Sequence, residues 1–245
     1  MDTWTLIEQP CRFNRRRGTD ALFTLGNGYL GCRGFFEEEQ EDVEALVGIY
    51  VAGVFGRGAL KAWKGMHREL VNTPNFFWVS LRVNGEALLC RPKRMAGYRR
   101  VLDMRRGVLD RRFTWTGSDG ARVRVRFERF LSVDDLHLAG QRIEIEALDR
   151  DVEIELLVGI DARVTQLNRV TTSPRPIQPG RRHLRTLRAG PDEIETVVDT
   201  LPKGVRLAEA QRAVLETPAG PLRGADAATT DLAARRFCFR LAAAK

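Results

Sequence analysis

A glycine-rich segment near the start of the chain matches the pattern with which proteins bind dinucleotide phosphates. Residues 26–31 read GNGYLG, and such glycines let the backbone approach a pyrophosphate when a strand precedes them and a helix opens on them. Residues 22–25 could supply the strand and Glu44 the ribose-binding acid. The helix is missing, because Gly34 and a run of acids stand where its first turns belong. We therefore predict a tight glycine turn and no nucleotide site.

The run of acids that follows could in principle supply a pair of catalytic carboxylates. Residues 37–42 read EEEQED. A working pair needs one desolvated acid and one ionised acid, whereas six crowded polar residues cannot all be buried. Like charges in a row also repel each other and extend the chain. We therefore predict a solvated loop here.

Metal-ligating and nucleophilic residues show no spacing that supports a site. His67, His137 and His183 are widely separated, and no cysteine or carboxylate pattern completes a metal shell. The Gly-x-Ser-x-Gly elbow of serine hydrolases is absent, and Ser118 falls in a predicted hairpin turn. The sequence thus predicts no metal site and no nucleophilic triad.

A polar loop flanked by aromatic residues has the composition of a sugar-binding surface. Residues 69–75 read ELVNTPN, with Trp63 before them and FFW at residues 76–78 after them. Aromatic faces can cover the apolar C–H groups of a sugar, while amide and carboxylate groups bind its hydroxyls. Large aromatic side chains are more often found in a core. The sequence leaves both interpretations open and favours the core.

The elements that must position these residues are strands. Hydrophobic and polar residues alternate at 79–83, and Asn84-Gly85 follows, the preferred pair for a type I′ hairpin turn. A second hairpin is predicted from residues 108–116 and 122–131. The other predicted strands cover residues 143–147, 152–158, 184–187, 194–200, 205–216 and 236–242. Short strands at about ten-residue spacing predict an all-β fold, a large antiparallel sandwich with few short helices.

Two of these segments need a choice. Residues 205–216 also fit a helix, and we favour a strand because the surrounding elements are strands. In the second hairpin the apolar phase slips between Phe127 and Phe130. A slip of one residue turns the side chains to the other face, so we predict a β-bulge near Glu128 and Arg129.

Length and composition indicate one globular domain in a reducing compartment. The 245 residues suit one large β domain, and we interpret the proline-rich residues 171–182 as a loop inside it. Asp2 stands where a signal peptide carries basic residues. The longest apolar stretch, 45–56, is shorter than the roughly 18 residues that cross a bilayer. Four widely spaced cysteines predict free thiols. We expect a cytoplasmic protein without a membrane partner.

The net charge of +8 raises the possibility of nucleic-acid binding. Basic residues are scattered, and their most regular feature is the alternation of Arg122, Arg124 and Arg126 on one face of a predicted strand. Acids alternate in the same way on the next two predicted strands: Glu144, Glu146, Glu153 and Glu155. Pairing between strands would neutralise such stripes, so we expect no nucleic-acid partner.

Several segments together resemble the N-terminal domain of glycoside hydrolase family 65, the maltose, trehalose and kojibiose phosphorylases. They are LFTLGNGYLGCRG at 22–34 followed by FEE at 36–38, YVAGVF at 50–55, ELVN at 69–72 with Pro74, LDMRRGVL at 102–109, and RFLS at 129–132. The resemblance covers residues 1 to about 161. Cys32 and Ile49 depart from the family pattern, which expects an aliphatic residue and a small polar residue there.

The resemblance implies a β-sandwich of the supersandwich, galactose mutarotase-like type that precedes an (α/α)6 catalytic barrel in the family. Family members are glycosyltransferases that cleave α-glucosides with inversion, and inorganic phosphate as co-substrate takes the place of activated water. Their acid is a glutamate of the barrel, so no residue here inherits a catalytic role and no cofactor is expected. The implied partners are the barrel, an α-glucoside disaccharide and a second copy of the chain.

The resemblance also implies a non-catalytic scaffold that shapes the substrate pocket or the dimer contact. Loops held by a rigid scaffold commonly carry such contacts. The candidate contact residues are Asn27, Arg33, Glu37, Trp63, Glu69, Asn72 and Asn75. The alternative is a stand-alone carbohydrate-binding module that uses Trp63, Trp78 and the loop at 69–75.

Overall fold

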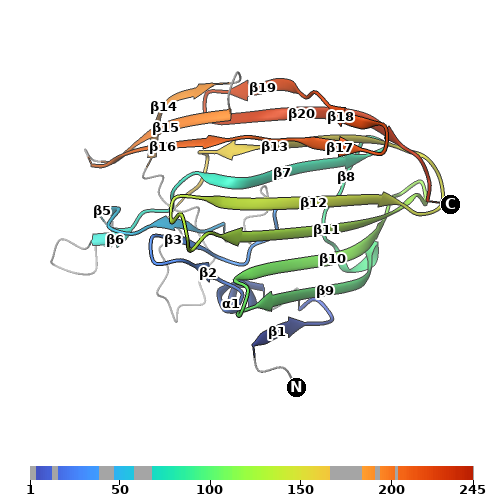
Figure 1. Ribbon diagram of the computed structural model, residues 1–245, viewed down its shortest axis with the longest axis horizontal. Helices are drawn as coiled ribbons and strands as arrows, with labels where there is room; N and C mark the ends of the chain where they lie inside the picture. Colours follow the sequence, from blue (N-terminus) through green and yellow to red (C-terminus); the bar gives the residue numbers. More distant parts are fainter. Residues whose placement is uncertain are drawn as a thin grey trace, which may run out of the picture.

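Two five-stranded antiparallel sheets pack face to face and confirm the predicted all-β sandwich (Figure 1). The computed structural model describes residues 4–12, 16–38, 47–57, 68–165, 184–190, 194–201 and 204–244. Trp63 and the loop predicted at 171–182 lie outside these residues. No helix of the described chain is long and apolar enough to span a membrane.

The first sheet contains the second predicted hairpin. Its order is β1 (Thr5–Glu8), β9 (Met95–Asp103), β10 (Val108–Thr116), β11 (Arg122–Leu131) and β12 (Ala139–Ala147). β10 and β11 have the bounds that the alternation predicted, and they pair without interruption from Val108 opposite Phe130 to Thr116 opposite Arg122.

The second sheet contains the first predicted hairpin. Its order is β19 (Ala225–Thr229), β20 (Leu232–Leu241), β13 (Val152–Asp161), β7 (Asn75–Val83) and β8 (Glu86–Ala87). Asn84 and Gly85 both have positive φ, 49° and 79°. A type I′ turn requires this conformation at both central residues, so the hairpin is confirmed.

The main core lies between the inward faces of these two sheets. Trp115, Val125 and Phe127 of the first sheet meet Leu81 and Leu156 of the second, and all five are buried. Burial at every second residue explains why strands of these sheets read as alternating patterns in the sequence.

Smaller elements complete the fold. They are α1 (Arg16–Leu22), β2 (Leu25–Gly26), β3 (Leu30–Cys32), β4 (Ile49–Val51), β5 (Phe55–Arg57), β6 (Arg68–Leu70), the 3₁₀ turn η2 (Pro92–Arg94), β14 (Leu184–Gly190), β15 (Ile194–Thr200), β16 (Arg206–Gln211), β17 (Leu215–Thr217) and β18 (Gly220–Leu222). β14, β15 and β16 form a third sheet. The choice of strand over helix for residues 205–216 is therefore confirmed.

The β-bulge predicted near Glu128 and Arg129 is wrong. β11 keeps an unbroken register with both neighbours at these residues. Arg129 occupies the inward position and is 0% exposed, while Phe130 points outward and covers Gly140. The alternation never slips, because an arginine takes a core position that the pattern assigned to an apolar residue.

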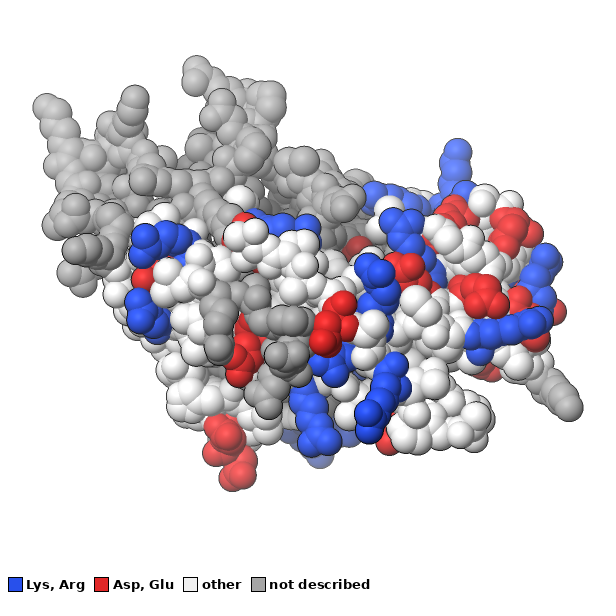
Figure 2. Space-filling view, turned by 90° about the horizontal axis from the view of Figure 1, so that it is seen from above, with Lys and Arg blue, Asp and Glu red and all other residues white. Residues whose placement is uncertain are grey.

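The predicted pairing of the charged stripes holds for one pair of strands. Arg124 and Arg126 of β11 form ion pairs with Glu146 and Glu144 of β12. The acids of β13 belong to the other sheet, where Glu153 lies opposite Arg240 and Glu155 opposite Arg82. In Figure 2, basic and acidic groups are interleaved over the described part of the face seen from above.

Close packing of β13 on β20 depends on Gly159. A methyl group there would stand 2.2 Å from the carbonyl oxygen of Ala233. We expect Gly159→Ala to lower the free energy of unfolding by about 1–3 kcal/mol, because backbone atoms must move. Gly31→Ala is the control, since a methyl there meets no atom within 4 Å. Urea denaturation of both variants measures the effect, and equal stability would contradict this account.

Candidate functional site

One end of the sandwich gathers the loops that hold the candidate contact residues (Figure 1). The turn at 104–107 joins β9 to β10 and the loop at 132–138 joins β11 to β12, so both leave the first sheet at the same end. We call this region the loop end. It comprises residues 26–31, 47–55, 71–75, 104–107, 132–138 and 162–165. The segments that resemble family 65 contribute to it or border it.

Asn27 fixes the glycine turn to the loop that follows β11. Its Oδ1 accepts hydrogen bonds from the backbone N–H groups of Tyr29 and Leu30, at 3.0 and 2.7 Å. Its Nδ2 donates to the carbonyl oxygens of Ser132 and Leu136, at 2.6 and 3.0 Å. Gly28 has φ of 91°, and strand β3 follows instead of a helix. The predicted tight glycine turn is confirmed.

Asn72 and Asn75 also bind backbone groups. Asn72 Oδ1 accepts from Ile49 N at 2.9 Å, and its Nδ2 donates to the carbonyl oxygens of Val47 and Thr165, at 2.7 and 3.1 Å. Asn75 is fully buried, and its Oδ1 accepts from Phe77 N at 3.0 Å. Asn72 thus holds three loop-end segments together, whereas the bond of Asn75 is local to the start of β7.

The other candidates lie in different places. Arg33 is half-buried beside Gly48, and its backbone N–H donates to the Gly48 carbonyl oxygen at 2.9 Å. Asn27, Asn72 and Asn75 thus lie in the loop end and Arg33 borders it, while Glu37 lies inside the sandwich. Glu69 is in β6, and its side chain is outside the described residues, as is all of Trp63.

The aromatic residues after the loop belong to the core. Phe77 is 2% and Trp78 6% exposed, which confirms the core interpretation for both. Neither side chain can lie flat on a sugar at the surface. Among the residues proposed for a carbohydrate-binding module, Trp78 is therefore excluded as a stacking surface.

Three arginines from neighbouring strands point into the sandwich. Arg100 of β9, Arg111 of β10 and Arg129 of β11 are 1%, 2% and 0% exposed. Arg100 lies directly opposite Arg111. An isolated buried charge is costly, so each guanidinium needs anionic partners inside the protein.

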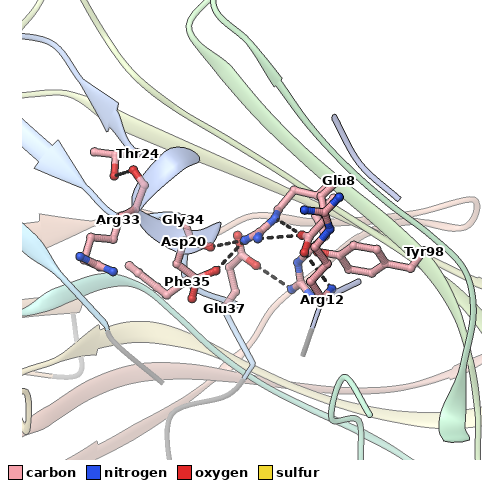
Figure 3. Close-up of polar contacts among 12 residues, drawn as sticks. Glu8, Arg12, Asp20, Thr24, Arg33, Gly34, Phe35, Glu37 and Tyr98 are labelled. Atoms are coloured by element: carbon pink, nitrogen blue, oxygen red, sulfur yellow. Dashed lines mark hydrogen bonds and ion pairs between the residues drawn. The ribbon is translucent and has the colours of Figure 1, made fainter. Parts of the chain in front are cut away.

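Arg100 binds two carboxylates from the N-terminal segment. It contacts Glu8 of β1 at 2.7 Å and Asp20 of α1 at 2.8 Å, and donates to the carbonyl oxygen of Gly34 at 2.6 Å. Tyr98 Oη donates to Glu8 as well, at 2.9 Å. Figure 3 shows Glu8, Asp20, Gly34 and Tyr98 converging on this point.

Arg111 and Arg129 hold the segment that follows β3. Arg111 binds Glu37 at 2.7 Å and Glu38 at 2.8 Å. Arg129 lies 3.3 Å from Glu37 Oε1 and donates to the carbonyl oxygen of Phe35 at 3.1 Å. Residues 33–38 are therefore fixed against the inner face of the first sheet.

The prediction of a solvated acidic loop is wrong for the first two acids. Glu37 is 3% and Glu38 5% exposed, because buried arginines neutralise them. The sequence carried a signal for these arginines: Arg111 is in phase with buried Leu109 and Phe113, as Arg129 is with Phe127. Residues 39–42 lie outside the described residues.

Electrostatics and ring contacts stabilise the charged forms. Burial would raise the pKa of Glu37, but Arg129 and Arg111 outweigh it and lower the pKa. Burial would lower the pKa of Arg111, but Glu38 and Glu37 raise it well above its usual value. Arg111 also lies 4.2 Å from the ring centre of Phe36. Such cation–π contacts favour a desolvated guanidinium.

A further acid, half-buried on the third sheet, was not predicted from the sequence. Glu209 of β16 pairs in register with Thr196 of β15. Its Oε2 is buried and has no hydrogen-bond partner in the described part of the chain. Burial raises the pKa of Glu209 well above its usual value. Burial thus disfavours the charged form of this side chain.

Exposed apolar side chains surround the loop end. On the loop that follows β11, Val133 is 80%, Leu136 39% and Leu138 54% exposed. Trp4 and Met104, on the neighbouring strand ends, are 50% and 48% exposed. Among the described residues, no group of three or more His, Cys, Asp or Glu could hold a metal ion.

Comparison with known proteins finds a matching domain family and several relatives. The model of "Glycosyl hydrolase family 65, N-terminal domain" matches residues 6–245. A kojibiose phosphorylase of Halothermothrix orenii is 31% identical over 66% of this chain and 20% of its own length. The kojibiose phosphorylase of Escherichia coli K12 is 35% identical over 61% of this chain and 18% of its own length. The chain thus spans about a fifth of the length of these curated relatives.

A solved structure shares the fold. It is named "Putative kojibiose phosphorylase from human microbiome", and it superposes with a TM-score of 0.80 at 22% identity. The match covers 99% of this chain and 31% of that one. The likeness therefore extends over the whole sandwich.

Removal of one buried arginine tests the ion network. We expect Arg111→Met to lower the free energy of unfolding by about 3–5 kcal/mol, because Glu37 and Glu38 lose their partner inside the protein. Arg124→Met on the next strand removes an exposed ion pair with Glu146 and should cost less than about 1 kcal/mol. Denaturation at pH 7 compares the two variants. Similar losses of unfolding free energy in the two variants would show that the buried ion pairs stabilise the protein no more than the exposed one.

The raised pKa of Glu209 predicts a dependence of stability on pH. Between pH 4.5, the usual pKa, and the raised pKa of the folded state, the unfolded carboxyl is ionised while the folded one keeps its proton. Unfolding then releases a proton, so stability falls as pH rises, by at most about 1.4 kcal/mol per pH unit. Glu209→Gln should remove this slope above pH 4.5, whereas Glu216→Gln, at an exposed position, should keep it. Parallel curves for wild type and Glu209→Gln would refute the assignment.

Proposed function

The chain belongs to the N-terminal domain family of glycosyl hydrolase family 65, and we propose that it is the non-catalytic scaffold of an inverting α-glucoside phosphorylase or hydrolase. In this proposal the catalytic domain, an (α/α)6 barrel, binds at the loop end. The relatives support it, because the chain corresponds to only their N-terminal fifth. Most of their length remains for the catalytic part.

The observation that carries the proposal is the apolar rim of the loop end. Val133, Leu136 and Leu138 project from one short loop, and that loop is tied to the glycine turn through Asn27. Exposed apolar side chains that cluster on a fixed loop are typical of an interaction surface. Most of the segments that resemble the family contribute to this end or border it.

The ion network supports a scaffold role and argues against catalysis by its own carboxylates. An inverting glycosidase needs an acid that reaches the glycosidic oxygen and gives up its proton. Glu8, Asp20, Glu37 and Glu38 are buried and bound to arginine. These acids instead hold the segments that lead into the loop end, as a preorganised surface requires.

The substrates belong to the assembled protein in this proposal. Kojibiose is the disaccharide to test first, since the matched relatives of Halothermothrix orenii and Escherichia coli are named for it. Inorganic phosphate would be the co-substrate. The loop end would shape one wall of the pocket that receives them.

A chimera tests the binding of a catalytic domain. The chain replaces the matching N-terminal segment of the Escherichia coli kojibiose phosphorylase, and release of glucose 1-phosphate from kojibiose is measured. We expect activity in the chimera and at least a tenfold loss with Leu136→Asp, because a charge is placed in an apolar interface. Leu222→Asp is the control, since Leu222 is also 39% exposed but lies in β18, away from the loop end (Figure 1).

The isolated chain provides the second arm of this experiment. A scaffold releases no glucose 1-phosphate from kojibiose, maltose or trehalose, and its tryptophan fluorescence shows no saturable change with these sugars. Cleavage by the isolated chain would refute the non-catalytic role. A saturable fluorescence change would favour the carbohydrate-binding module. Equal effects of the two aspartate substitutions on the chimera would remove the loop end as the binding surface.

A further inference from the structure

The outer face of the first sheet carries a groove that the proposed scaffold role does not use. Its volume is about 530 Å³, and residues of β9, β10, β11 and β12 line it. Five arginines and five carboxylates are among the lining residues. The charges cancel in number, so the pairing decides which of them are available to a ligand.

The carboxylates of the groove are all engaged. Glu146 binds Arg124. Asp110, Glu128 and Glu144 all bind Arg126.

The fifth carboxylate, Asp103, accepts backbone N–H groups from the turn at 104–107. The N–H groups of Arg105 and Arg106 each lie 3.0 Å from its Oδ1. No carboxylate of the groove is therefore left for its remaining arginines.

Arg106, in the turn at 104–107, and the pair Arg99 and Arg112 are the arginines left over. Only Arg99 and Arg112 stand side by side on neighbouring strands. They lie directly opposite each other on β9 and β10, and neither guanidinium has an ion pair or hydrogen bond with any described residue. Like charges directly opposite on a sheet repel each other. The adjacent residues, Arg100 on β9 and Arg111 on β10, form a second opposed pair on the inner face. That inner pair is neutralised by buried carboxylates, whereas the outer pair lacks an anion.

A β-bulge lies next to this pair. Arg112 pairs with Arg99, but the next pairing joins Thr114 to Ala96, so Gly97 and Tyr98 together face one residue. Gly97 has φ of 62°, and a methyl group there would meet no atom within 4 Å. The bulge thus adds backbone without a side chain beside Arg99. Bulges often re-aim side chains near binding sites.

We propose that Arg99 and Arg112 bind the phosphate group of a small anion, either inorganic phosphate or a phosphate ester. Side chains opposite each other on a sheet start about 5 Å apart, so both guanidiniums can reach one group. Two positive charges match a phosphate dianion, and the planar fork of arginine donates two hydrogen bonds to its oxygens. The groove extends past Val101 and Val108, which leaves room for the organic part of an ester.

The neighbouring charges favour a compact anion over a polyanion. The row that contains Arg99 and Arg112 continues to Arg126 and then Glu144, and the next row holds Asp110 opposite Glu128. A nucleic-acid backbone laid across the sheet would meet these acids. A single phosphate group at Arg99 and Arg112 would not have to pass over them.

Calorimetry of the 245-residue chain at low ionic strength tests the site. Inorganic phosphate and glucose 6-phosphate are the two ligands, which separate the sources of the phosphate group, and sodium acetate is the monoanion control. We expect saturable binding of at least one phosphate ligand and none of acetate. Arg99→Gln and Arg112→Gln should each weaken it at least tenfold, because each removes charge-assisted hydrogen bonds. Arg236→Gln is the matched control, an exposed arginine of β20 without a partner among the described residues.

Thermal unfolding gives an independent readout. Phosphate should raise the melting temperature of the wild type and of Arg236→Gln, but not that of Arg99→Gln or Arg112→Gln. The outward positions of both arginines allow the variants to fold, which their melting curves without ligand will show. The proposal is overturned if neither phosphate ligand binds the wild type. It is also overturned if all three arginine variants weaken binding equally, because the effect would then be one of net charge.

Discussion

The structure depends on one constraint: a guanidinium inside a sandwich must be neutralised there. Arg100, Arg111 and Arg129 stand at inward positions of three neighbouring strands. Their carboxylate partners come from β1, α1 and the segment after β3. Those segments are short. Each carries an anion that one of these arginines requires, and the ion pairs help to fix the segments against the first sheet.

The buried ion network determines how the segment at 33–38 lies on the first sheet more than it adds to the stability of the protein. Replacing a whole buried ion network with apolar residues often leaves a protein equally stable. Apolar residues would let the segment at 33–38 slide along the sheet, because hydrophobic contacts are not directional. Ion pairs with hydrogen-bond geometry fix its position instead. The glycine turn is continuous with that segment, and Asn27 ties it to the loop after β11. The buried ion network therefore helps to fix the position of the loop end.

The sequence predicted the strands well, because apolar and polar residues alternate along β7, β10 and β11 as their burial does. It failed where a charged residue lies inside. Treating Arg129 as outward created a bulge that does not exist, and treating Glu37 and Glu38 as solvated hid their partners. Both errors share one cause, the rule that charges belong outside. The roles of Asn27 and Asn72 could not be read either, because their backbone partners are distant in sequence.

Both faces of the first sheet carry a pair of opposed arginines, but only the inner pair is neutralised by carboxylates of the described chain. β9 and β10 place an arginine pair on each face, Arg100 with Arg111 inside and Arg99 with Arg112 outside. Water can hydrate the outer pair, so the fold tolerates it without a carboxylate. Hydration does not remove the repulsion between two like charges held opposite each other. Because Arg126 takes three of the nearby acids, an anion for the outer pair has to come from outside the described chain.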